Sequence, residues 1–496
     1  MREALRRLGA DSAVYGLGQV LGRAVQLLLV PILTRVLTPG AFGVTELVQG
    51  YLQTAALVLV FGMDGALARF FYQEPDRPAR VRMVSTSLAF RLLTSGVAAA
   101  AVASLGTPLA AALVGGEVYR KYVLIGTLTM PFTLLALFAN DVLRVTFQPY
   151  KYIALNIVQT TLVTGLSIVL VVRFHLGPAG VLYGRLLGDS LAAAFGLVLI
   201  RHALALRFSR STLARMLSYG LPAVPAAFGF AAIATLDRYV LQRTRTLEEV
   251  GVYAVALRFF SVMTFAASAF QLAYGPFAYA RAATPEAPRL FARVLVLYAA
   301  VASLGALVIA AFAPEIVAIL VPVKYHAASV PALWLAFAAV ALGAYTVTSI
   351  GIGLALKTPL LGVCAWGGAL AAALIHATLT PRLGAPAAGF ATLVGYGVAA
   401  ALTYRIAQRV HPFPYRGGLA LMLFALELGL ACGAQALAGA GILGVAARLA
   451  AVLGFVGVCA WLRVWTERGA VARARDPKDR GEAGGAGPDP AAREGF

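Results

Sequence analysis

The sequence predicts an all-helical protein that crosses a membrane many times. Of its 496 residues, 60% are hydrophobic and only 12% are charged, and the mean hydropathy is +0.82. A soluble domain needs more polar surface than this to cover its core. Apolar runs of about 20 residues recur along the chain, each long enough to cross ~30 Å of hydrocarbon as a helix. Alternating ten-residue strands, the signature of a membrane β-barrel, do not occur in the sequence.

Fourteen spans are expected from these runs, with boundaries good to a few residues. They lie near residues 12–34, 40–62, 83–105, 122–143, 152–172, 178–200, 218–241, 249–272, 291–313, 328–350, 358–379, 386–408, 418–438 and 441–464. The first is expected to be a retained span and not a cleaved signal peptide, because no A-x-A site precedes a polar mature chain. The tail, 466–496, is polar and rich in Gly, Pro and charge, so we expect it to be disordered and cytoplasmic.

The distribution of Lys and Arg predicts that both termini are cytoplasmic. With that orientation, the inner segments hold about three times as many basic residues as the outer loops, as the positive-inside rule requires. The net charge of +20 is then explained by loops that face an anionic lipid surface, and nucleic-acid binding is not needed to account for it.

Two short patterns occur once in each half of the chain and suggest a duplication. Tyr15-Gly16-Leu17 is matched by Tyr219-Gly220-Leu221, and Phe42-Gly43-Val44 by Val250-Gly251-Val252. Six spans is an even number, so both halves enter the membrane in the same orientation and form a parallel repeat. This predicts a V-shaped cleft between two six-helix lobes with an amphipathic cytoplasmic connector and two added spans. The proposed segments are 1–200 for the N-lobe, 201–217 for the connector, 218–410 for the C-lobe and 411–465 for spans 13 and 14.

Helix-weakening residues fall at matching places in spans 1 and 7. Gly22 and Pro31 lie in the first, and Pro222 and Pro225 in the second. Ordinary packing or static kinks would also explain them, since Gly and Pro are common in membrane helices. Their matched positions favour hinges in helices that line a moving cleft.

Several charged residues fall inside the predicted spans. Such a group costs at least about 2.5–3.5 kcal/mol at mid-bilayer on insertion scales, so it needs a partner, water or a function. Arg23, Glu46 and Arg258 lie on spans 1, 2 and 8, which would face the cleft, and Arg91 lies within span 3. Arginine presents a planar fork that matches phosphate, so the pattern favours an anionic, phosphate-bearing substrate. The alternative is a Glu46–Arg258 salt bridge that only holds the lobes together.

Other charges have simpler expected roles. Arg185 and Asp189 are four residues apart and can neutralise each other on one helix face. Glu427 and Arg448 have similar depths on spans 13 and 14 and are expected to pair. At the ends of helices, Asp64, Asp141 and Arg144 are expected at the cytoplasmic side, and a gate at the outer side is predicted to contain Arg35, Asp237 and Arg238.

Metal, cofactor and enzyme signatures are missing from the sequence. The three cysteines and five histidines are scattered, with no CxxC spacing, and no Walker A motif occurs. No DxD motif is present, the first outer loop has no acidic residue, and no large outer loop carries a cluster of charges. We therefore expect no cofactor, no metal and no enzymatic activity.

The chain resembles polysaccharide-biosynthesis flippases of the multidrug/oligosaccharidyl-lipid/polysaccharide exporter superfamily, over about residues 1–465. The residues that carry the resemblance are Asp11-Ser12-Ala13-Val14-Tyr15-Gly16, Leu33 to Pro39, Phe42-Gly43, Asp237-Arg238-Tyr239 and Glu248 to Ala256. The resemblance implies a cationic cavity and transfer of an undecaprenyl-pyrophosphate-linked oligosaccharide from the inner to the outer leaflet of the bacterial inner membrane. Expected partners are the lipid-linked substrate, membrane lipids, a glycan polymerase and glycosyltransferases.

The related lipid II flippases have fourteen spans and cavity arginines on spans 1 and 8. The resemblance therefore implies substrate-binding roles for Arg23 and Arg258, and a related role for Glu46. Two other functions stay open, a lipid II flippase and a multidrug or cation antiporter of the same superfamily. The antiporters usually have twelve spans and an acidic cavity, and this chain differs from them in both respects.

Overall fold

A computed structural model describes residues 29–205, 207–281, 284, 287–437 and 441–462. In these residues, helices joined by short turns make up the structure, and 13 helical segments are long and apolar enough to cross a membrane. The predicted fold class, an all-helical multi-pass membrane protein, is confirmed. The first predicted span lies mostly outside the described residues, and its described end, 29–36, is helical.

The first half of the chain forms a group of helices that we call the first bundle. Its helices are α2 (Pro39–Val60), α3 (Met63–Gln73), α4 (Arg77–Val114), α5 (Arg120–Val145), α6 (Pro149–Ile168), α7 (Pro178–Ile200) and α8 (Arg210–Gly220). Local sequence explains several starts: Pro39, Pro149 and Pro178 occupy first-turn positions, where a missing N–H costs nothing. The Thr38 side chain accepts a hydrogen bond from Ala41 N and caps α2.

The second bundle follows, and a further pair of helices lies beside it. The second bundle consists of α9 (Val224–Thr244), α10 (Leu247–Arg281), α11 (Ala287–Leu320), α12 (Ser329–Leu354), α13 (Pro359–Thr378), α14 (Thr380–Leu383) and α15 (Ala385–Val410). The added pair is α16 (Gly417–Ala436) and α17 (Gly441–Trp461). Helix α16 packs against α11, which places the pair at the outer side of the second bundle.

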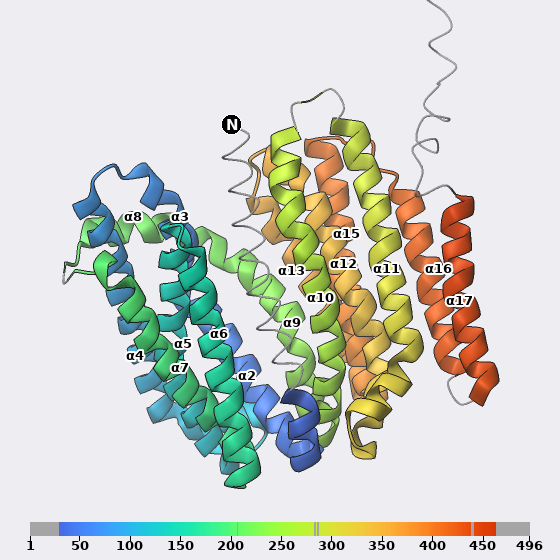
Figure 1. The fold of residues 1–496 in the computed structure, drawn as a ribbon, viewed down its shortest axis with the longest axis horizontal. Helices are drawn as coiled ribbons and strands as arrows, with labels where there is room; N and C mark the ends of the chain where they lie inside the picture. The colour runs from blue at the N-terminus through green and yellow to red at the C-terminus, as the bar shows by residue number, and fades with distance from the viewer. Residues whose placement is uncertain (1–28, 206, 282–283, 285–286, 438–440, 463–496) are drawn as a thin grey trace, which may run out of the picture.

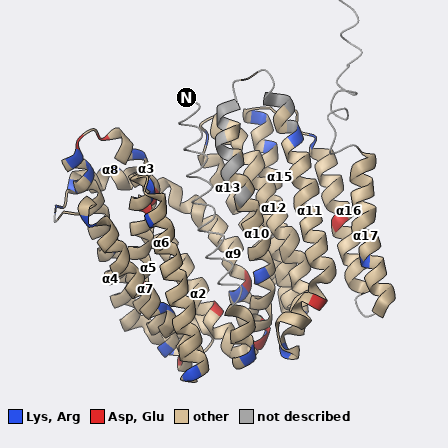
Figure 2. Ribbon diagram, in the orientation of Figure 1, with Lys and Arg blue, Asp and Glu red and all other residues tan. Residues whose placement is uncertain are grey.

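The two bundles meet at one end and diverge at the other (Figure 1). We call the end where they meet the hairpin end, because the turns at 37–38 and 245–246 lie there. The opposite end carries α8, and we call it the connector end. Lys and Arg gather near the ends of the helices, and few charges lie midway along them (Figure 2).

Helix α8, the last helix of the first bundle, covers most of the predicted connector and packs on α3 and α4. Its Leu213, Met216 and Leu217 join the apolar cluster of that bundle. The next helix, α9, starts six residues later than the sequence predicted. A 3₁₀ turn, η4 (Leu221–Ala223), precedes it, because the two prolines at 222 and 225 cannot donate backbone hydrogen bonds.

The contact at the hairpin end is made by α2 and α10, whose first turns cross closely. A Cβ on Gly43 would lie 2.3 Å from the Leu247 carbonyl oxygen, and one on Gly251 would lie 1.9 Å from that of Pro39. Only glycine allows this approach. The two similar sequence patterns, Phe42-Gly43-Val44 and Val250-Gly251-Val252, are therefore the segments that touch.

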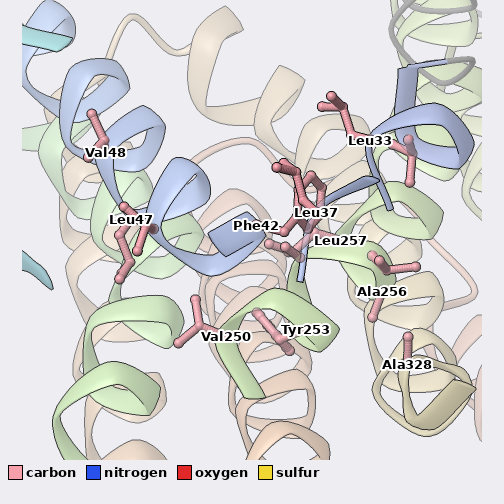
Figure 3. Close-up of a cluster of buried hydrophobic side chains, with 14 of the residues drawn as sticks. Leu33, Leu37, Phe42, Leu47, Val48, Val250, Tyr253, Ala256, Leu257 and Ala328 are labelled. Carbon is pink, nitrogen blue, oxygen red and sulfur yellow. The ribbon is translucent and has the colours of Figure 1, made fainter. Parts of the chain in front are cut away.

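Apolar and polar contacts around this crossing complete the closure. Phe42, Leu47, Val250 and Tyr253 pack in one buried cluster (Figure 3). The Leu37 carbonyl accepts hydrogen bonds from Lys324 Nζ at 2.7 Å and Tyr325 OH at 3.2 Å, both from the turn η5 (Val323–Ala328). The hairpin end is thus sealed by packed backbone and side chains from both halves of the chain.

Candidate functional site

A cavity of about 1630 Å³ lies between the two bundles. Helices α2, α5, α6 and α7 line one wall, and α9 and α10 line most of the other. The lining extends from Glu46, near the hairpin end, to Asp64 and Ser218–Gly220 at the connector end. Because the hairpin end is sealed, this conformation presents the cavity toward the connector end.

Glu46 and Arg258 form an ion pair on the cavity lining, between Oε1 and Nη2. Glu46 lies on α2 and Arg258 on α10, so the pair joins the two bundles. Glu46 is nearly fully buried, whereas about a third of the Arg258 side chain is exposed to the cavity. The Arg258 Nε atom has no hydrogen-bond partner among the described residues. The structure therefore contains the salt bridge that the sequence left as an alternative, and it leaves part of the Arg258 guanidinium exposed to the cavity.

A second charged pair lies on α9. Asp237 is fully buried and accepts hydrogen bonds from Tyr253 OH and from the Arg238 backbone N–H, both at 2.7 Å. The Arg238 side chain extends toward α2, where a Cβ on Gly50 would approach its Nη1 to 3.1 Å. Asp237 and Arg238 both line the cavity. The sequence placed them near the outer end of span 7 as gate residues, and the structure places them deeper, seven and six residues before the end of α9.

The remaining predicted site residues do not gather at the cavity. Arg23 and Gly22 lie outside the described residues. Arg91 is a correction to the prediction, because it is absent from the cavity lining and buried inside the first bundle. Its Nη2 pairs with Asp141 Oδ2 at 2.8 Å, and its guanidinium lies 5.3 Å from the centre of the Phe138 ring. Arg35 is exposed at the hairpin end.

Of the three predicted hinge residues that the structure describes, Pro222 is the one in the cavity lining. The Pro225 carbonyl accepts a hydrogen bond from Trp366 Nε1 at 2.9 Å, which ties the start of α9 to α13. Pro31 is partly buried in the helical segment 29–36. The two later prolines thus lie where the connector turns into the second bundle.

The predicted pair on α7 is confirmed, with Arg185 Nε 3.6 Å from Asp189 Oδ2. Both residues were predicted to have a structural role only, yet both line the cavity. Asp189 also accepts hydrogen bonds from Thr133 Oγ1 and, at 2.8 Å, from Gln159 Nε2. One buried carboxylate therefore fixes α5, α6 and α7 as a single wall.

Neutral polar residues on α6 were missed at the sequence level. Asn156, Gln159, Thr160, Thr164 and Ser167 all line the cavity. They recur at spacings of three and four, which puts them on one helix face. This spacing of amide and hydroxyl side chains inside an apolar span was the available signal.

The expected Glu427–Arg448 pair is wrong. Arg448 forms its ion pair with Glu315 of α11, and both carboxylate oxygens of Glu427 lack a hydrogen-bond partner among the described residues. Similar depth on neighbouring helices does not determine which way each side chain points. In the described part of the chain, no group of three His, Cys, Asp or Glu side chains could hold a metal ion.

Comparison with known proteins places this architecture in a family. The sequence model of the Polysaccharide biosynthesis protein family matches residues 8–276, more than half of the chain. The chain belongs to the polysaccharide biosynthesis protein family. A curated relative, an uncharacterized membrane protein of Haemophilus influenzae, is 32% identical over 87 residues, which is 18% of this chain and 21% of that protein.

Solved structures show the same fold in flippases and transporters. The lipid II flippase MurJ, in an inward closed conformation, aligns with a TM-score of 0.71 at 11% identity, covering 91% of this chain and 99% of MurJ. Multidrug resistance MATE transporters of the MOP superfamily align with TM-scores of 0.59 when inward-facing and 0.58 when outward-facing. Both are 17% identical, covering 78% and 80% of this chain and 94% and 95% of theirs. This family member therefore has the fold that is seen in MurJ and in these MATE transporters.

Proposed function

We propose that this protein moves an undecaprenyl-pyrophosphate-linked oligosaccharide from the inner to the outer leaflet of the bacterial inner membrane. The observation that carries the proposal is the partly exposed Arg258 guanidinium on the cavity lining, with Arg238 as a second cation there. Guanidinium groups bind phosphate oxygens through charge-assisted, often bidentate hydrogen bonds. The family match and the flippase fold support the same class of cargo.

The Glu46–Arg258 pair suggests how cargo binding is coupled to opening. A pyrophosphate that takes Arg258 competes with Glu46 and removes an ion pair that joins the bundles. Cargo then binds more tightly to a conformation in which the pair is broken, and this difference in affinity shifts the population toward it. The glycine crossing at the hairpin end is the contact that must separate next. Arg23 is proposed to contribute a further cation from span 1.

The direction of transport is proposed to follow the membrane potential. A lipid pyrophosphate carries roughly two negative charges, and moving one charge through 100 mV is worth about 2.3 kcal/mol. Outward movement is then downhill by up to ~4–5 kcal/mol when the charges cross the whole field. Flipping measured in proteoliposomes should slow or stop when an imposed potassium-diffusion potential is reversed. An unchanged rate would mean that another gradient supplies the direction.

The orientation proposed here puts the connector end and both termini in the cytoplasm. Cysteines introduced at positions 38 and 246, at the hairpin end, should react with an impermeant thiol reagent added to intact cells. Cysteines at positions 76 and 212, at the connector end, should react only after the cells are permeabilised. The reverse pattern would mean that the protein has the opposite orientation in the membrane, and it would rule out the proposed direction.

A multidrug or cation antiporter is the second candidate, because the MATE transporters share the fold. Purified protein in proteoliposomes should flip a fluorescent undecaprenyl-pyrophosphate-linked oligosaccharide, and cells should not gain efflux of a cationic dye. Dye efflux without lipid flipping would favour the antiporter. Lipid II should be tested as a third cargo, because a lipid II flippase is the remaining alternative. If removing the protein from cells abolishes the surface glycan but leaves the peptidoglycan intact, the lipid-linked oligosaccharide is favoured over lipid II. A glycan polymerase and glycosyltransferases are the proposed partners.

A further inference from the structure

One wall of the cavity offers hydrogen bonds without net charge. On α6, Asn156, Gln159, Thr160 and Thr164 face the cavity together. Asn156 and Thr164 are eight positions apart, or about 12 Å along the helix axis. A membrane helix that turned this face to lipid would leave several polar groups unsatisfied, so the face is suited to a polar occupant.

The hydroxyl of Thr164 is the second observation. Its residue is 6% exposed, lines the cavity, and has no hydrogen-bond partner for Oγ1 among the described residues. Other threonines in the spans behave differently: Thr127 and Thr129 on α5 donate to the carbonyls four residues earlier, at 2.8 and 3.0 Å. An unpaired buried hydroxyl is disfavoured, so a ligand group that pairs with it gains affinity.

Neighbouring contacts orient the amide groups on the same face. Asn156 Nδ2 donates to Asn140 Oδ1 at 2.9 Å and to the Tyr152 carbonyl at 2.8 Å, which uses both of its hydrogens. Gln159 Nε2 donates to Asp189. The two amide oxygens remain as acceptors, while the threonine hydroxyls both donate and accept.

We propose that this α6 face is the subsite for the sugar hydroxyls of the cargo. A sugar hydroxyl both donates and accepts, and so matches a mixed set of neutral acceptors and hydroxyls better than a cation or an anion does. Arg238 on α9 and Arg258 on α10 hold the pyrophosphate, and the α6 face holds the glycan attached to it. This inference rests on the proposed function and adds the part of the cavity that tells one glycan from another.

Binding of two lipids to the full-length protein in nanodiscs tests the subsite. One lipid is undecaprenyl pyrophosphate bearing a neutral trisaccharide, and the other is undecaprenyl pyrophosphate without sugar. Thr164→Val should weaken binding of the glycosylated lipid about three- to tenfold and leave the sugar-free lipid unchanged. Thr164→Ser should restore binding, because it returns the hydroxyl, and Thr129→Val, on a buried threonine outside the lining, should change neither lipid.

The outcomes separate the subsite from the function. Equal losses for both lipids, or no loss for the glycosylated one, would overturn the sugar subsite while the flippase proposal stands. If the unaltered protein binds neither lipid, the proposed function itself fails, and the subsite with it. A normal melting temperature for each variant, together with recovery by Thr164→Ser, excludes misfolding as the cause of a loss.

Discussion

The two walls of the cavity differ in chemistry. The wall from the first bundle carries amides and hydroxyls on α6, and one of its carboxylates, Asp189, is surrounded by donors from three helices. The opposite wall is largely apolar and aromatic, with Phe230 and Phe260 in the lining, but it also carries Arg238 and Arg258. A cargo with a charged group, a neutral polar part and an apolar tail would find a different surface for each. The charged residues alone therefore do not describe what this cavity can bind.

The largest expected effect comes from Arg258→Ala, which removes the cation from the second wall. Lost charge-assisted hydrogen bonds correspond to about 10- to 100-fold weaker binding of undecaprenyl pyrophosphate. Arg258→Lys should recover little, because a point charge lacks the bidentate geometry. Binding to nanodisc-reconstituted protein is the measurement.

Glu46→Gln is the matched change in the partner of this arginine. It keeps the shape of the side chain but removes the competitor for Arg258, so affinity for the sugar-free lipid should rise several-fold. Unchanged affinity in both variants would mean that the pair only holds the bundles together and that the phosphate binds elsewhere.

The next effect concerns the seal between the walls. Gly251→Ala places a Cβ against the Pro39 carbonyl, so the hairpin end should no longer close fully. A cysteine at position 261, in the cavity lining, should then react several-fold faster with an impermeant reagent added from the hairpin side. Gly165→Ala is the control, because a Cβ there meets nothing within 4 Å. Equal reactivity in both variants would show that the crossing is not the barrier.

The next prediction concerns Arg448, which is absent from the cavity lining, in contrast to Arg238 and Arg258. Arg448→Met removes a buried charge from the pair with Glu315, whose side chain is 41% exposed. We expect the free energy of unfolding to fall by roughly 1–3 kcal/mol, because the hydrogen bonds to a charged group are lost. Lipid binding should change less than twofold. A strong binding defect at normal thermal stability would instead place α16 and α17 in the transport path.

The sequence predicted interactions within one helix better than those between helices. Arg185 and Asp189 were paired correctly because four-residue spacing brings side chains together on any helix. Arg91 and Glu427 were placed wrongly because hydropathy gives the depth of a residue and not the direction of its side chain. The Arg91 partner, Asp141, is fifty positions away on α5, and the Arg448 partner, Glu315, lies just beyond the predicted end of span 9. The crossing at the hairpin end could not be predicted either, because its only trace in the sequence is two glycines, Gly43 and Gly251.

The smallest effect is expected at Arg185, the cation on the first wall. Its guanidinium is held within its own bundle, by Asp189 at 3.6 Å and by Gln49 Oε1 at 3.4 Å, so a phosphate must compete with two partners for it. Arg185→Gln should weaken binding of the sugar-free lipid by no more than about two- to threefold, the size of one weak neutral hydrogen bond. Asp189 keeps its bonds to Thr133 and Gln159, so the α6 face should stay in place and binding of the glycosylated lipid should fall by the same small factor. The measurement is the affinity of the Arg185→Gln variant for each of the two lipids, compared with the affinities of the Arg258→Ala variant for the same lipids. If Arg185→Gln costs as much as Arg258→Ala, both walls grip the phosphate, and the division between a charged wall and a neutral wall is wrong.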